Sequence, residues 1–139
     1  NDIEYIIMER KPGGYRKPSE LQRKKSMIDR KDFRDWFSQI WEMPGASTKN
    51  GHPAPFPMSL ADRLVKMFSF VGDTVLDPFC GSGTTMLAAK NSERNSIGVE
   101  TEEYYCNYII QRLEADRTLF DEYTVEYFNL SQEMDTYNA

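Results

Sequence analysis

Two acidic residues, Asp77 and Glu100, each close a short apolar run and are spaced for ligand binding. The turn after Asp77 contains Gly81 and Gly83, and Glu100 stands nineteen residues after Gly81. The glycines allow a tight turn and a close approach of the backbone to a ligand. A carboxylate at that distance, at the end of the next parallel strand, is placed to accept hydrogen bonds from ribose hydroxyls. The pattern predicts a nucleoside-type ligand at the carboxyl edge of a sheet.

The residues after the turn narrow the class of ligand. Many strand-to-helix turns carry two glycines for geometry alone, so the turn by itself is weak evidence. Gly83 is followed by Thr84 and Thr85, so the Gly-Lys-Ser/Thr sequence of a phosphate-binding loop is missing. Met86 stands where the dinucleotide fingerprint has its third glycine. A nucleoside cofactor without a pyrophosphate therefore fits better than NAD.

Three segments taken together resemble the DNA amino-methyltransferases. Residues 77–85, Asp-Pro-Phe-Cys-Gly-Ser-Gly-Thr-Thr, look like the S-adenosylmethionine motif of these enzymes, Asp-Pro-Phe-x-Gly-x-Gly-Thr-Thr. Residues 52–57, His-Pro-Ala-Pro-Phe-Pro, resemble the segment that closes the methionine end of their cofactor pocket. Residues 97–100 resemble their ribose-binding strand. The order of the segments is that of the circularly permuted beta class, which methylates adenine-N6 or cytosine-N4.

The resemblance, which covers residues 51 to about 105, implies a fold and a cofactor. We expect an α/β fold that is part of a Rossmann-like S-adenosylmethionine-dependent methyltransferase domain, with a parallel sheet, flanking helices and a small helical recognition segment. Residues 1–50 would hold the end of the catalytic half and the DNA target-recognition segment, and residues 51–139 the cofactor-binding half. The cofactor implied is S-adenosylmethionine. The cofactor-binding residues implied are His52, Pro53, Ala54, Phe56, Asp77, Pro78, Phe79, Cys80, Gly81, Ser82, Gly83, Thr84 and Glu100.

The resemblance also implies a reaction, and one element of it is missing from the chain. In this family the exocyclic amino group of a flipped-out adenine or cytosine takes the methyl group. The Pro-Pro-Tyr-type motif, which in this family accepts hydrogen bonds from that amino group, is absent from the sequence. In the permuted order it would lie upstream of Asn1. We therefore assign no catalytic residue. We expect a C-terminal half of a restriction-modification enzyme that is inactive alone and has DNA and the missing half, or a complementary subunit, as partners.

Two alternatives remain open on the residues alone. A non-catalytic DNA-binding or regulatory module could keep the methyltransferase fold without the chemistry, and retained cofactor affinity would separate it from an enzyme. A small-molecule or RNA methyltransferase would be expected to place its cofactor motif first and its catalytic residues afterwards. Nothing after Glu100 fits such residues.

Charge is distributed unevenly along the chain. Residues 1–50 hold eleven lysines and arginines against eight acidic residues, while residues 51–139 hold six against fourteen. The basic first segment, residues 1–50, suits contact with phosphate groups, and the acidic second segment, residues 51–139, suits binding of a cationic sulfonium. Acidic residues in the second part of the chain could also serve only to keep its helices solvated. We prefer this interpretation for residues 114–139. The DNA-binding candidates are Arg16, Lys17, Arg23, Lys24 and Lys25.

Other features bound the class of protein. The two cysteines, Cys80 and Cys106, provide no disulfide framework, and they fit a reducing cytoplasm. We expect a cytoplasmic protein of prokaryotic or phage type. His52 is the only histidine and has no cysteine pair near it, so we expect no metal site. No apolar run is long enough to cross a membrane. The chain begins at Asn1 and not at methionine, so we expect it to start inside a longer gene product.

The periodicity of apolar residues predicts the elements that would position these residues. A helix over 32–41 should place Phe33, Trp36, Phe37, Ile40 and Trp41 on one core-facing stripe. A helix from Pro57 to about 70 should bury Leu60, Leu64, Met67 and Phe68. The other predicted elements are strands over 4–9, 74–76, 97–100 and 123–128 and helices over 84–91 and 102 to about 120.

Overall fold

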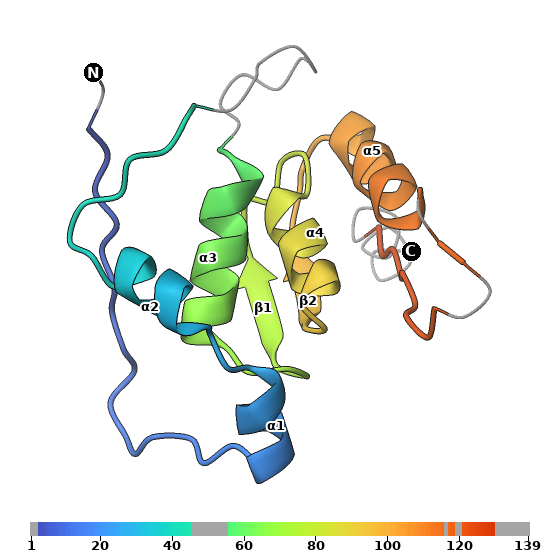
Figure 1. Cartoon of the computed structure of the whole chain (residues 1–139). Helices are drawn as coiled ribbons and strands as arrows, with labels where there is room; N and C mark the ends of the chain where they lie inside the picture. Colours follow the sequence, from blue (N-terminus) through green and yellow to red (C-terminus); the bar gives the residue numbers. More distant parts are fainter. Residues whose placement is uncertain (1–2, 46–55, 116, 119–120, 130–139) are drawn as a thin grey trace.

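The structure is a computed structural model that describes residues 3–45, 56–115, 117–118 and 121–129. Figure 1 shows its elements in order along the chain. They are α1 (Glu20–Lys25), α2 (Arg30–Trp36), α3 (Met58–Phe68), β1 (Thr74–Asp77), α4 (Thr84–Asn91), β2 (Asn95–Gly98) and α5 (Glu103–Glu114). None of the helices in these residues has the length and hydropathy needed to cross a bilayer.

β1 and β2 form a parallel pair joined by α4. Thr74 lies opposite Asn95, and Asp77 lies opposite Gly98. Parallel strands need a crossover connection, and α4 provides it. The carboxyl ends of both strands therefore meet at one edge of the sheet, as the sequence predicts. The prediction of a parallel sheet with flanking helices is confirmed.

Helices cover only one face of this sheet among the described residues. Ala61 and Val65 of α3 and Ala88 of α4 form a buried cluster against which Val75 of β1 packs. The alanines allow the two helices to approach closely. On the opposite face, Leu76 is 62% exposed and Ile97 is 55% exposed. A parallel sheet is normally covered on both faces, so this face is unusually open.

α5 packs around a second buried cluster beside the turn that follows β1. Its Ile109 and Leu113 are buried together with Cys80. Lys90 of α4 donates a hydrogen bond to the carbonyl oxygen of Leu113 at 2.5 Å, and the hydroxyl of Tyr123 donates to the same oxygen at 2.9 Å. A cation at the C-terminal end of a helix also interacts favourably with the helix dipole. These contacts fix the end of α5.

α1, which the sequence did not predict, docks on the amino end of β1. Ser19 and Gln22 form a capping box at its start. The side-chain amide of Gln22 donates to the carbonyl oxygen of Val71 at 2.9 Å, and the backbone N–H of Val71 donates to the hydroxyl of Ser26 at 2.8 Å. In Figure 1, α1 lies where β1 begins, away from the arrowhead.

α2 corrects the prediction of a helix over 32–41. Asp29, not Asp32, accepts the capping hydrogen bonds, and the helix ends at Trp36. Because the backbone leaves the helix at Phe37, the predicted stripe is not continuous. Phe33 and Phe37 are each 52% exposed, and Ile40 is exposed as well, so the prediction that all five face the core is wrong.

The remaining elements differ from their predictions in smaller ways. β1 and α4 match the predicted ranges closely, whereas β2 begins and ends two residues early and α5 ends at Glu114. In α3 the buried residues are Ala61 and Val65, one position along from the predicted face. The strands predicted over 4–9 and 123–128 are absent, because neither segment has a partner strand among the described residues.

Candidate functional site

The turn after β1 is held at the carboxyl edge of the sheet by the backbone of the β2 segment. The N–H of Val99 donates to the carbonyl oxygen of Asp77 at 2.9 Å, and the N–H of Cys80 donates to the carbonyl oxygen of Val99 at 3.0 Å. The carboxylate of Asp77 accepts from the N–H of Phe79 at 3.1 Å. This arrangement leaves Phe79 88% exposed at the carboxyl edge of the sheet.

Gly81 and Gly83 both adopt the left-handed conformation, with φ of 50° and 76°. Gly83 also lies tightly against α5, because a Cβ there would stand 2.9 Å from Cγ1 of Ile109. Both the backbone conformation and the lack of space therefore require glycine at position 83. The predicted tight turn is confirmed at this residue, and the close approach seen there is to Ile109 of α5. The predicted approach to a ligand stays a prediction.

Glu100 is held as an ionised acceptor at the same edge. Its Oε1 accepts from the backbone N–H groups of Thr101 at 2.7 Å and Glu102 at 3.0 Å. These hydrogen bonds, that of Glu102 above all, lower the pKa of the Glu100 carboxyl, and the N–H of Gly81 contributes to the same shift. The link to Gly81 brings the carboxylate next to the glycine turn, as the spacing predicts.

Cys80 lies beneath the turn and not on its surface. Its side chain is buried against Ile109 and Leu113. Burial, with the nearby carboxylates of Asp77 and Glu100, raises the pKa of the Cys80 thiol to about 11. The thiol is therefore neutral near pH 7, and it supports the turn from within.

Arg112 of α5 contacts the turn and was not singled out in the sequence. Its Nη1 donates to the carbonyl oxygen of Ser82 at 2.8 Å and to the hydroxyl of Thr84 at 3.3 Å. Thr84 is buried at the start of α4. The only signal in the sequence was its position three residues after Ile109, which places it beside the buried stripe of α5.

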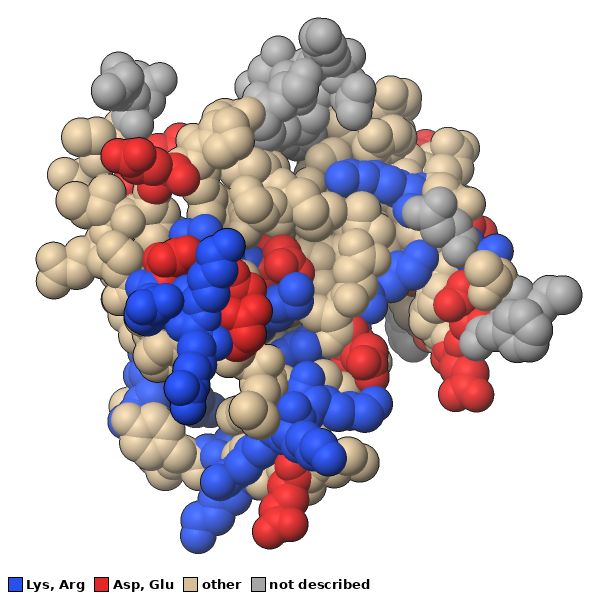
Figure 2. All heavy atoms as spheres, viewed as in Figure 1, with Lys and Arg blue, Asp and Glu red and all other residues tan. Residues whose placement is uncertain are grey.

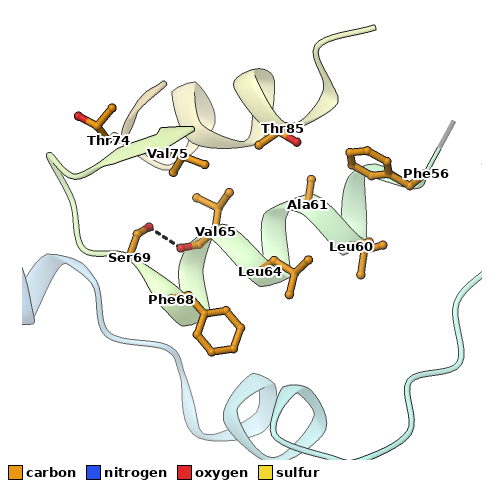
Figure 3. A pocket seen from close by; sticks show the side chains of 10 residues that line it. All are labelled: Phe56, Leu60, Ala61, Leu64, Val65, Phe68, Ser69, Thr74, Val75 and Thr85. Atoms are coloured by element: carbon orange, nitrogen blue, oxygen red, sulfur yellow. Dashed lines mark hydrogen bonds between the residues drawn. The ribbon is translucent and has the colours of Figure 1, made fainter. Parts of the chain in front are cut away.

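The structure gathers most of the predicted cofactor residues at one edge of the sheet. Residues 77–84 and Glu100 lie together at the carboxyl edge of the sheet. His52, Pro53 and Ala54 lie outside the described residues. Phe56 lines an apolar groove of about 500 Å³ between α3 and β1. Figure 3 shows its ring at the end of this groove where Thr85 lies, directly after the turn.

The DNA-binding candidates lie around α1, at the opposite end of the sheet. Figure 2 shows lysines and arginines gathered over the lower part of the molecule, where Figure 1 places α1. Arg16 is ion-paired with Asp73, and Lys25 with Glu93 at 2.8 Å. Within the part of the chain that the structure describes, Lys17, Arg23 and Lys24 are exposed and have no ion pair.

Comparison with known proteins places this geometry in a family. The family described as DNA methylase matches residues 1–112. The type II methyltransferase M.MjaI of Methanocaldococcus jannaschii is 46% identical over 110 residues, which cover 73% of this chain and 35% of that protein. The type II methyltransferase M.MthZI of Methanothermobacter thermautotrophicus is 37% identical, over 93% of this chain and 39% of that protein.

A solved structure shares the fold. A DNA modification methylase of Thermus thermophilus, crystallised with S-adenosyl-L-methionine, is 49% identical, with a TM-score of 0.66 over 76% of this chain and 41% of that one. The chain thus spans well under half the length of the relatives it matches. The family match covers most of its residues. The chain belongs to the DNA methylase family.

Proposed function

We propose that the chain is the cofactor-binding part of a site-specific DNA methyltransferase of the restriction-modification type. The methyl group would pass from S-adenosylmethionine to the exocyclic amino group of adenine or cytosine. The observation that carries the proposal is the pairing of the glycine turn after β1 with the ionised carboxylate of Glu100 at one sheet edge. Relatives named as type II methyltransferases support the activity, and the bound ligand of the Thermus methylase supports the cofactor.

The residues at this edge fit a nucleoside with a positively charged sulfonium. The Glu100 carboxylate has the charge and position to accept hydrogen bonds from two ribose hydroxyls. The left-handed Gly81 and Gly83 set the path of the turn at this edge, and the exposed Phe79 offers an apolar wall. When bound, the cofactor supplies an electrophilic methyl group. The chain's own task is to hold and orient it.

Residue roles follow from this placement. We propose that residues 77–84 contact the cofactor around its methionine and sugar, Cys80 through its backbone because its side chain is buried, and that Glu100 binds the ribose. His52, Pro53, Ala54 and Phe56 would shape the far wall of the pocket. Residues 51–139 would then form the cofactor-binding half, and residues 1–50 the end of the catalytic half with the target-recognition segment.

The open face of the sheet supports a complementary portion of the enzyme as partner. Leu76 and Ile97 expose apolar side chains on a parallel sheet, which normally has both faces covered. We propose that the portion carrying the Pro-Pro-Tyr-type motif packs there, either in the same polypeptide or as a separate subunit. That portion would bring the catalytic motif to the carboxyl edge where the cofactor is held.

We propose that DNA contacts the basic surface formed by Arg16, Lys17, Arg23, Lys24 and Lys25. Because Arg16 and Lys25 already pair with carboxylates, Lys17, Arg23 and Lys24 should contribute more to phosphate binding. We expect a Lys17→Ala, Arg23→Ala, Lys24→Ala variant to bind duplex DNA more weakly and with a shallower salt dependence. Arg16→Ala combined with Lys25→Ala serves as the control, and an equal or larger loss in the control would contradict this assignment.

Calorimetric titration with S-adenosylmethionine tests the proposed cofactor site. We expect Glu100→Ala to weaken binding about tenfold or more, because charge-assisted hydrogen bonds to the ribose are lost. Glu103→Ala removes the same charge three residues away, in the exposed first turn of α5, and should leave the affinity nearly unchanged. Binding that is insensitive to Glu100 would show that the ligand sits elsewhere. DNA binding without any cofactor affinity would instead favour a non-catalytic module.

A further inference from the structure

Arg112 of α5 forms hydrogen bonds to the glycine turn from outside it. We infer that it is a positioning residue for the cofactor, an inference that rests on the proposed function and extends it to a residue outside the turn. Nη1 of Arg112 reaches the carbonyl oxygen of Ser82 at 2.8 Å and the hydroxyl of Thr84 at 3.3 Å. One guanidinium therefore bridges the residues on both sides of Gly83.

The peptide group between Ser82 and Gly83 is fixed at both of its polar ends. Its carbonyl oxygen accepts from Arg112, and its N–H donates to the carbonyl oxygen of Cys80 at 2.7 Å. In a trans peptide these two groups point in opposite directions. Glycine tolerates either sign of φ, so a peptide plane next to it turns over at little steric cost. Arg112 opposes that rotation, because turning the plane breaks both hydrogen bonds.

The wall of α5 behind the turn makes this restraint effective. Ile109, three residues before Arg112, lies so close to Gly83 that a Cβ there would stand 2.9 Å from its Cγ1. Ile109 is buried, and Arg112 is half-buried beside it. The two residues therefore form one face of α5 that sets both the position of the turn and the orientation of its peptide group.

The orientation of the Arg112 side chain is not explained by pairing with an acidic side chain. Among the described residues its hydrogen bonds go to Ser82 and Thr84, and it forms no ion pair with a carboxylate. A guanidinium that binds a backbone carbonyl in this way restrains a loop directly. Residues that bind a ligand need such support to stay in a productive geometry.

Three variants of the 139-residue chain test the inference. Arg112→Met keeps the aliphatic stem and removes the donors, while Arg112→Lys keeps the charge and one donor group. Arg117→Met makes the same chemical change five residues later, where the side chain pairs with Glu114 and lies over the Tyr123 ring. S-adenosylmethionine affinity is measured by calorimetry, and amide hydrogen exchange is measured at Gly83, with thermal unfolding recorded for each variant.

We expect Arg112→Met to weaken S-adenosylmethionine binding about tenfold, the loss of one charge-assisted hydrogen bond, and to speed exchange at Gly83. Arg112→Lys should recover part of the affinity, and Arg117→Met should bind as the unaltered chain does. If Arg112→Met binds normally, or if Arg112→Lys shows the full loss although it unfolds at the same temperature as the unaltered chain, Arg112 has no positioning role and the proposed function stands. If the unaltered chain itself does not bind, the proposed function fails, and this inference fails with it.

Discussion

At the scale of single residues, the geometry of the site depends on glycines that have no room for a side chain. Gly83 combines a left-handed backbone with close contact to Ile109, a stiff β-branched residue in a helix. Gly98 would place a Cβ 2.4 Å from Sδ of Met86 and 2.8 Å from Sγ of Cys80, although its backbone is unstrained. At position 83 both the backbone conformation and the lack of space favour glycine, whereas at position 98 only the lack of space does.

Gly83→Ala should lower the free energy of unfolding by about 2–4 kcal/mol, the sum of backbone strain and overpacking. Chemical denaturation measures the change. Adding Ile109→Ala to Gly83→Ala should relieve the steric part, so the two substitutions should be less costly together than their separate effects imply. Gly14→Ala, where a Cβ meets nothing within 4 Å, is the control and should have little effect. Full additivity of the first pair would contradict the close contact.

Cys80 should resist alkylation at pH values where ordinary thiols react. Burial raises its pKa to about 11, so the reactive thiolate becomes abundant only as the pH approaches that value. Labelling with iodoacetamide across a pH series, read by mass spectrometry, checks this. We expect free cysteine to react well before Cys80 as the pH rises. Rapid labelling of Cys80 near pH 8 in the folded chain would refute its burial beneath the turn.

At the scale of elements, α2 is attached to α3 through a cation between two indole rings. The guanidinium of Arg63 lies 4.7 Å from the Trp41 ring and 5.7 Å from the Trp36 ring. Trp41 Nε1 donates to the carbonyl oxygen of Trp36 at 2.9 Å, which holds the segment after α2 against its own helix. The aromatic face that we predicted from periodicity is thus divided between this contact and an exposed Phe33–Phe37 stack.

Arg63→Ala should loosen this contact and cost about 1 kcal/mol of stability, typical of a partly desolvated cation–π interaction. Tryptophan fluorescence reports the change directly, because Trp36 and Trp41 are the chain's two tryptophans. We expect emission at longer wavelength and stronger quenching by iodide. Arg117→Ala, far along the chain from both rings, is the control. An Arg63→Ala spectrum identical to that of the unaltered chain would argue against the contact.

The elements that could be predicted are those that pack locally. β1 and α4 follow from the apolar run, the glycine turn and the alanines, all within residues 74–91. α1 was missed because none of its residues is buried and its docking relies on two hydrogen bonds, one that Gln22 donates to the carbonyl oxygen of Val71 and one that Ser26 accepts from the N–H of Val71. No periodicity reveals such contacts. Likewise, Arg112 and Thr84 form a hydrogen bond although they lie 28 residues apart in the sequence. Residue spacing alone does not show that contact.

At the scale of the whole molecule, the sheet face that the described residues leave open is the feature that supports the proposed partner. Leu76 and Ile97 stand on it, whereas Val75 points to the covered face. The chain spans 35% and 39% of the two methyltransferases described above, so their sequences contain ample material to cover such a face. Exposed apolar patches of this kind mark interaction surfaces.

Placing lysine at both exposed positions, Leu76→Lys with Ile97→Lys, should leave the isolated chain folded but block the complementary portion. Exposed substitutions usually change stability by about 0.5 kcal/mol or less, whereas charges buried in an interface are costly. Thermal unfolding of the chain alone checks that the variant stays folded. Co-purification of the two portions checks that association is blocked. Tyr104→Lys, on an exposed part of α5, is the control. Unimpaired association of the double variant would place the partner elsewhere.

The most direct test of the central claim is methyl transfer from labelled S-adenosylmethionine to unmodified duplex DNA. The chain is assayed alone and together with the complementary portion that carries the Pro-Pro-Tyr-type motif. We expect the chain alone to bind the cofactor without transferring the methyl group, and the combination to methylate DNA in a manner that Glu100→Ala impairs. Transfer by the chain alone, or no transfer by an associated and cofactor-bound combination, would contradict the claim that this is the cofactor-binding part of a DNA methyltransferase.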